Sequence, residues 1–164
     1  MSAKQAKAEF FGAVPGFPIS LAVRAGDYAY TATLGSHTFD ANKVTYDSDG
    51  RVLSDGSGRG DERIEEQTRA TMRNVEAALS GVACTLEDVI DMTVWLRDPR
   101  DFIAFNRTYA EFFRVNKPTR TVLRADFMFD CRIEMKAIAY KPRAIAPTKH
   151  AKSRRDRTPR QSQR

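Results

Sequence analysis

Two residues stand out because their types and surroundings suit chemistry. Arg120 follows Pro118 by two residues, in the stretch KPTRTVLRADF, where a helical pattern gives way to a strand pattern. Glu134 interrupts an otherwise apolar strand pattern, CRIEMKAIAY. A guanidinium can hold a carboxylate through two parallel hydrogen bonds, and a nearby carboxylate can orient water or carry a proton. The pair suits attack of water on a small anionic substrate, although a surface ion pair between neighbouring strands is the plainer alternative.

Other reactive residue types are sparse. The sequence has no GxGxxG, phosphate-loop or HExxH motif, and its two histidines, His37 and His150, lie in a polar stretch and near the end of the chain. Its two cysteines, Cys84 and Cys131, form neither a disulfide framework nor a metal-ligand cluster. We therefore expect no metal, no cofactor, and a reduced, cytoplasmic setting.

The positive charge of the chain is concentrated at one end. The 164 residues carry a net charge of +6, yet residues 141–164 alone hold nine Lys and Arg against one acid. Residues 143–164 have few large apolar side chains, so we predict a disordered basic tail. This tail could be a solubilising extension or an arm that contacts RNA or another polyanion weakly. No apolar run is long enough to span a membrane, and the N-terminus lacks the pattern of a secretory signal.

The elements that must position Arg120 and Glu134 follow from the hydrophobic periodicity. Residues 20–35 predict two strands with a turn at Gly26-Asp27. Residues 35–61 are polar, with Asp49-Gly50 as a hairpin signal between short strands at 44–46 and 51–53. Residues 61–80 show a helical period that Gly81 ends.

The second half of the domain continues this alternation. Residues 88–98 alternate as a strand, with Ile90, Met92, Val94 and Leu96 expected on one face. Asp98 and Pro99 predict the start of a helix that ends before Pro118. Strands are expected at 120–126 and 131–140. The expected buried stripe of the second helix is Phe102, Phe105, Tyr109, Phe112 and Phe113.

This order predicts an α+β domain in which two helices pack on one face of a single mixed sheet. We expect that two helices cannot cover every apolar strand residue and that a second subunit covers the rest. The residues behind this expectation are Val94, Leu96, Val122, Ile133 and Met135.

Several longer stretches make the chain similar to a known family. Residues 18–141 resemble the Rid family of reactive intermediate deaminases, whose members are also labelled L-PSP endoribonucleases or translation initiation inhibitors. The stretches are AVRAGDYAYTAT, IEEQTRATMRNVEAAL, LEDVIDMTVWLRDPRDFIAFNRTYAEFF, KPTRTVLRADF and RIEMKAIAY. The resemblance implies a chorismate-mutase-like fold and a homotrimer with active sites between subunits. It divides the chain into an N-terminal extension (1–17), a Rid-like domain (18–142) with a loop insertion (35–61), and the tail.

The resemblance also implies an activity and residue roles. The family hydrolyses enamine and imine intermediates such as 2-aminoacrylate to 2-keto acids and ammonia, without a cofactor. By correspondence with its motifs, Arg120 would bind the substrate carboxylate and Glu134 would hold the attacking water. Asn106 and the backbone at Val122 would complete the substrate contacts.

Three departures from the family pattern predict a more apolar pocket and a changed substrate. Ile19 stands for a pocket tyrosine, Ala32 and Thr33 for a serine and a glycine, and Val122 for a frequent cysteine. Two other functions remain open at this point: an RNA-binding or endoribonuclease protein, and a non-catalytic trimer that binds a small molecule in the same clefts.

Overall fold

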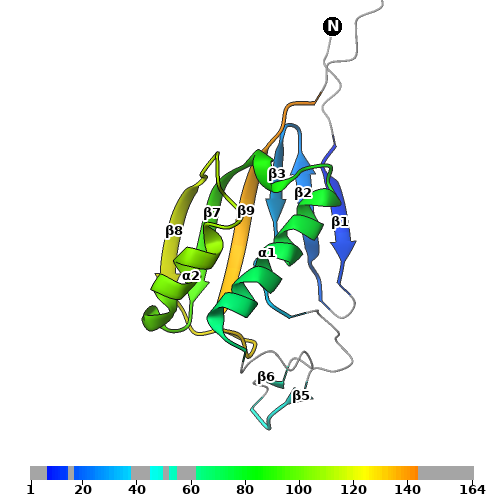
Figure 1. Cartoon of the computed structure of the whole chain (residues 1–164). Coiled ribbons are helices and arrows are strands. Elements are labelled where there is room, and N and C mark those ends of the chain that lie inside the picture. The colour runs from blue at the N-terminus through cyan, green and yellow to red at the C-terminus, as the bar shows by residue number, and fades with distance from the viewer. Residues whose placement is uncertain (1–6, 15–16, 38–44, 50–51, 55–61, 144–164) are drawn as a thin grey trace, which may run out of the picture.

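One mixed sheet carries two helices on a single face (Figure 1). The computed structural model describes residues 7–14, 17–37, 45–49, 52–54 and 62–143. The seven-stranded sheet has the order β1-β2-β3-β9-β7-β8, and β4 also pairs with β9. The elements are β1 (Glu9–Ala13), β2 (Ser20–Ala25), β3 (Tyr28–Thr31), β4 (Leu34–Gly35), β5 (Thr45–Tyr46), β6 (Val52–Ser54), α1 (Ile64–Ser80), η1 (Leu86–Asp88), β7 (Val89–Leu96), η2 (Pro99–Asp101), α2 (Phe102–Tyr109), β8 (Thr119–Arg124) and β9 (Ile133–Tyr140).

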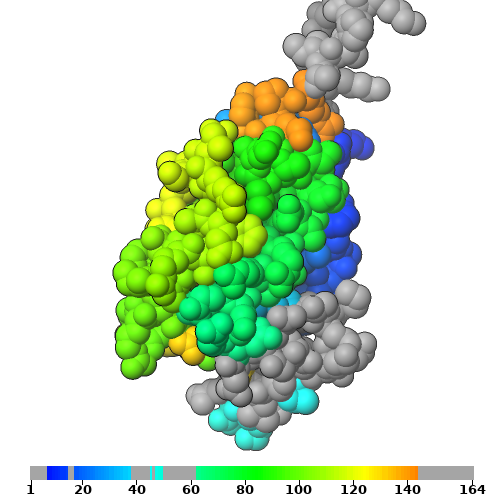
Figure 2. Space-filling model, viewed as in Figure 1, coloured from blue at the N-terminus to red at the C-terminus, as the bar shows by residue number. Residues whose placement is uncertain are grey.

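The pairing confirms the predicted α+β architecture. β7 and β8 are parallel and joined through α2, whereas β7 and β9 are antiparallel. A parallel pair needs a crossover connection, and α2 supplies it. Figure 2 shows α1 and α2 covering the face toward the viewer, so the core lies between these helices and the sheet.

The predicted hairpins are present. β2 and β3 are antiparallel, and Gly26 between them has φ +63°, a left-handed conformation that favours glycine. β5 and β6 pair with each other as expected, whereas Gly50 and Arg51 between them lie outside the described residues. Within the expected N-terminal extension, residues 9–13 form β1 and pair with β2. Residues 38–44, 50–51 and 55–61 of the insertion and the tail from residue 144 lie outside the described residues.

The second helix is shorter than expected. Asp98 accepts a hydrogen bond from the Arg100 backbone N–H at 2.8 Å, which confirms the predicted start. The α-helix ends at Tyr109, however, so its buried aromatic residues are Phe105 and Tyr109, and the buried Phe113 follows the helix. Phe102 is 39% exposed and Phe112 is half-buried, because they flank these buried residues.

The expected alternation along β7 breaks at its start. Val89 is buried and Ile90 is 44% exposed, the reverse of the prediction. The pairing of β7 with β9 shifts between Val89 and Asp91, and such a bulge moves the following side chains to the opposite phase.

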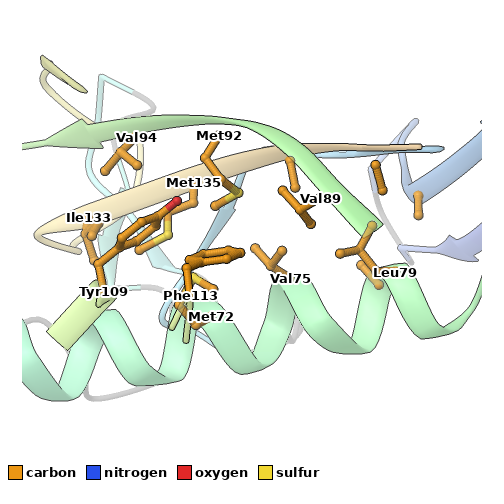
Figure 3. Close-up of a cluster of buried hydrophobic side chains, with 14 of the residues drawn as sticks. Met72, Val75, Leu79, Val89, Met92, Val94, Tyr109, Phe113, Ile133 and Met135 are labelled. Carbon is orange, nitrogen blue, oxygen red and sulfur yellow. The ribbon is translucent and has the colours of Figure 1, made fainter. Parts of the chain in front are cut away.

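The expectation that some apolar strand residues need a second subunit was wrong for the residues that suggested it. Val94, Leu96, Ile133 and Met135 are buried within one chain, and Val122 is half-buried against them. Figure 3 shows Val94, Ile133 and Met135 directed toward the helices, with Met72 and Val75 of α1 opposite. The apolar side chains left exposed on the other face of the sheet are Tyr28, Tyr30, Leu123 and Tyr140.

Within the described part of the chain, no helix combines the length and the hydropathy that a membrane crossing requires.

Candidate active site

Arg120 lies at the edge of the sheet, held against α2. Its Nη2 donates a hydrogen bond to Asn106 Oδ1 at 2.7 Å. Its guanidinium carbon lies 4.7 Å from the centre of the Tyr109 ring and 5.2 Å from that of Phe105. Stacking on two aromatic rings and one amide bond restrict the orientation of the guanidinium before any ligand binds.

The strand ladder explains why Arg120 points toward α2. In the parallel pairing of β7 and β8, Arg120 lies opposite Met92, which is buried beneath the helices. Residues opposite each other share a face, so Arg120 and Val122 both lie on the helix-bearing side. Thr119 fixes the start of β8, because its hydroxyl donates to Asp91 Oδ1 at 2.6 Å.

The pocket beside Arg120 suits an anion. It has a volume of about 370 Å³, and its described lining includes two cations, Arg120 and Lys117, and no acidic side chain. The lining residues are Asn106, Tyr109, Ala110, Phe113, Lys117, Pro118 and Arg120. We call this set, together with Phe105 and Val122, the arginine half-site.

Glu134 lies elsewhere. The expected adjacency of its strand to that of Arg120 was wrong, because β7 lies between β8 and β9. Glu134 pairs with Trp95 and alternates with the buried Ile133 and Met135, so its side chain lies on the face away from the helices. Arg120 and Glu134 therefore occupy opposite faces of one chain, and the ion pair between neighbouring strands does not form.

Glu134 borders a pocket of about 400 Å³ on this open face. Burial raises the pKa of its carboxyl group, and within residues 17–37 and 62–143 no donor or cation reaches that group. The lining residues are Thr33, Trp95, Ala125, Asp126, Phe127, Met128, Phe129 and Glu134, which we call the glutamate half-site. A carboxyl group in these surroundings is suited to gaining and losing a proton.

The other predicted site residues divide among the two half-sites and a third hollow. Asn106 and Val122 accompany Arg120. Ile19, Ala32 and Thr33 line a third hollow of about 500 Å³, and Thr33 also borders the Glu134 pocket. One chain thus presents the arginine half-site and the glutamate half-site on opposite faces of the sheet.

Sequence reasoning missed most of the remaining lining residues, among them Tyr109, Lys117, Trp95 and Phe127. Tyr109 was assigned only to the core, and the parallel β7-α2-β8 crossover was the signal that would have placed it under Arg120. Lys117, Trp95 and Phe127 carried no pattern that distinguishes a pocket wall from an ordinary surface. The described residues contain no cluster of three His, Cys, Asp or Glu side chains that could hold a metal ion.

Comparison with known proteins agrees with this fold. The family model described as "Endoribonuclease L-PSP" matches residues 18–141. A RutC family protein of Pyrococcus abyssi is 35% identical over 118 residues, covering 71% of this chain and 87% of that protein. The 2-iminobutanoate/2-iminopropanoate deaminase of Salmonella typhimurium is 29% identical over 119 residues, 70% of this chain and 87% of the relative.

Solved structures show the same fold at lower identity. Yeast Mmf1 superposes with a TM-score of 0.66 at 20% identity, covering 82% of this chain and 99% of that one. E. coli TdcF with bound serine gives a TM-score of 0.61 at 23% identity, covering 78% and 91%. The strand order, the extent of the family match and the identity to the RutC relative lead to one conclusion: the chain belongs to the Rid family, also called the L-PSP endoribonuclease family.

Proposed function

We propose that the protein is a cofactor-independent deaminase that hydrolyses 2-imino acids and their enamine tautomers to 2-keto acids and ammonia. The proposal rests on the orientation and the surroundings of the Arg120 guanidinium. Its guanidinium is oriented by Asn106 and Tyr109 in a pocket without an acidic lining residue, so its charge is available to a carboxylate ligand. The deaminase name of the Salmonella relative supports the same activity.

The proposed site is shared between subunits of a homotrimer. Arg120 and Glu134 lie on opposite faces of one chain, so a single substrate meets both only if a second copy supplies one of them. The exposed face of the sheet supports such an interface, because it presents the apolar side chains Tyr28, Tyr30, Leu123 and Tyr140 on the same face as Glu134. In this assembly Arg120 of one subunit faces Glu134 of the next.

The proposed chemistry needs only water. Arg120 binds the substrate carboxylate, while Glu134 accepts a proton from water as the water oxygen bonds to the imine carbon. Glu134 then returns this proton to the nitrogen of the carbinolamine. The C–N bond breaks and the C=O bond forms as the hydroxyl group gives its proton to the Glu134 carboxylate, from which the departing ammonia takes it up. A protonated imine is already electrophilic, so orienting the water and the substrate supplies most of the acceleration.

An imine-trapping assay tests the proposal. An amino-acid oxidase generates the 2-imino acid in the presence of semicarbazide, and a deaminase lowers the yield of the semicarbazone. We expect the wild-type protein to lower it and Arg120→Ala to lose this effect. Arg73→Ala, which truncates an exposed arginine of α1, serves as the control and should behave as wild type. Equal rates with Arg120→Ala and wild type would remove the mechanism.

RNA binding is a second candidate, favoured by the nine basic residues in 141–164 and by the family's endoribonuclease label. The affinity for a single-stranded RNA is measured at several salt concentrations, for the full chain and for residues 1–142. The comparison distinguishes binding through the charge of the tail from binding at a site on the folded domain. Affinity that disappears with the tail indicates an electrostatic arm only. Ligand-dependent shifts in Tm without turnover would instead favour a non-catalytic binding trimer.

The cytoplasm is the location we propose. Cys84 and Cys131 are both buried, and burial raises the pKa of the Cys84 thiol. A buried thiol with a raised pKa is unreactive, and such a thiol suits a reducing compartment.

A further inference from the structure

The glutamate half-site is walled mainly by aromatic and apolar side chains. Trp95 of β7 lies opposite Glu134, and Phe127, Met128 and Phe129 come from the segment between β8 and β9. The two charged groups in its described lining, Glu134 and Asp126, are both acidic. The carboxylate of a 2-imino acid is therefore repelled here and attracted to Arg120, so the side chain of the substrate is the part that can enter.

We propose that this pocket accepts the substrate's side chain and selects 2-imino acids with an aromatic or other large apolar side chain. The inference rests on the proposed deaminase function and adds the class of substrate that the site accepts. A volume of about 400 Å³ lies within the range of small-molecule sites and exceeds what a methyl group can fill. A phenyl group can bury apolar surface against Trp95 and Phe127, whereas a methyl group leaves most of the wall without a contact.

The wall is built before any ligand binds. Arg97 donates a hydrogen bond to the Phe129 carbonyl oxygen at 3.1 Å and another to Asp130 Oδ1 at 2.9 Å. Its guanidinium carbon also lies 5.9 Å from the centre of the Phe127 ring. These contacts tie the segment that carries both phenylalanines to the end of β7.

Phe129 is held from its other side as well. Its ring centre lies 5.0 Å from that of His37 and 6.3 Å from that of Phe17. Groups that are already ordered lose little entropy when a ligand docks, so an apolar side chain gains most of the contact energy of this wall.

Binding of two stable product analogues tests the inference without turnover. L-3-Phenyllactate and L-lactate differ by one phenyl group, and Trp95, the only tryptophan of the chain, reports on the pocket through its fluorescence. We expect phenyllactate to change the emission of Trp95 and to bind the full-length protein at least about tenfold more tightly than lactate. Equal affinities, or no binding of either ligand, would overturn the inference.

Three variants test which side chains make the protein bind phenyllactate more tightly than lactate. Phe127→Ala should weaken phenyllactate at least about fivefold and leave lactate unchanged. Met128→Ala, at a side chain that is 77% exposed and carries little of the fold, should weaken phenyllactate about twofold. Ile103→Ala truncates a side chain of α2 that is 66% exposed and lies outside the pocket, so it should change neither affinity. If Phe127→Ala and Met128→Ala weaken the binding of phenyllactate and lactate equally, this pocket does not bind the side chain of the substrate.

Turnover separates this inference from the proposed function. Imines generated from phenylalanine and from alanine are compared in the semicarbazone assay. Faster hydrolysis of the phenylalanine-derived imine supports the inference, and faster hydrolysis of the alanine-derived imine overturns it while the deaminase activity stands. Selective binding of phenyllactate without hydrolysis of either imine supports the pocket assignment and overturns the proposed activity.

Discussion

The arginine and glutamate half-sites are built in opposite ways. The first presents a cation on the helix-bearing face, where the rings of the core hold it in position. The second presents an acid on the open face, where the pocket wall comes from a connecting segment. The period of two residues in a strand separates them, because β7 and its neighbours direct alternate side chains to opposite faces. Among the described lining residues, the charged side chains of the first are all basic and those of the second are all acidic.

The largest expected difference between the half-sites is in stability. Phe105 is fully buried and lies under Arg120, so Phe105→Ala should lower the free energy of unfolding by about 3–5 kcal/mol. Phe127 is half-buried on the open face, and Phe127→Ala should lower the free energy of unfolding by about 1 kcal/mol. Urea unfolding of both variants measures the contrast, and equal losses would mean that the glutamate half-site is as much a part of the core as the arginine half-site.

The amide that orients Arg120 should affect substrate binding more than turnover. Asn106→Ala removes the acceptor at 2.7 Å, and we expect KM for an imine to rise about tenfold with a smaller change in kcat. Asn106→Asp places a carboxylate beside Arg120 that competes with the substrate, so it should raise KM further. A lower KM for the aspartate variant than for the alanine variant would contradict a carboxylate-binding role of Arg120.

The hydroxyl of Tyr109 offers a finer test of the same region. It is buried and has no hydrogen-bond partner among the described residues, and burial raises the pKa of Tyr109, so the group stays protonated. Tyr109→Phe keeps the ring under Arg120 and removes the unsatisfied group. It should stabilise the fold by about 1 kcal/mol in urea unfolding. Destabilisation of similar size would reveal a partner for the hydroxyl.

The smallest expected effect is a pH dependence at Glu134. Burial raises the pKa of this carboxyl group in the folded protein, so the folded state binds its proton more tightly than the unfolded state. Its contribution to stability is complete below the ordinary glutamate pKa and is lost as pH rises through the raised value. Glu134→Gln should remove this loss, so the Tm of the variant minus that of wild type should grow with pH across the window. If the difference in Tm does not change with pH, the Glu134 carboxyl group is solvated in the folded protein.

Local pattern predicted the parts of the fold that adjacent residues determine. The Gly26 turn, the buried face of α1 and the Asp98 cap each depend on a few consecutive residues, and all are present. Local pattern did not predict that β7 separates β8 from β9, because strand order depends on pairing between distant segments. The expectation that Arg120 and Glu134 are neighbours failed for this reason.

The candidate site shows the same limit. Alternation correctly grouped Val94 with Leu96, yet it could not say which face the helices cover, so these residues were wrongly assigned to a subunit contact. The bulge that exposes Ile90 leaves no signal in the sequence. The expected roles of Arg120 and Glu134 came from their residue types and from the family resemblance, and that of Asn106 came from the resemblance alone. The structure adds that one chain holds Arg120 and Glu134 on opposite faces.

Mixing two inactive variants tests the shared site most directly. Arg120→Ala and Glu134→Gln subunits are unfolded together, refolded as a one-to-one mixture, and assayed for imine hydrolysis. If each site takes Arg120 from one subunit and Glu134 from the next, about one quarter of the sites in random trimers keep both groups, so about a quarter of wild-type activity should return. A mixture no more active than the average of the two variants would contradict a site built between copies of the chain.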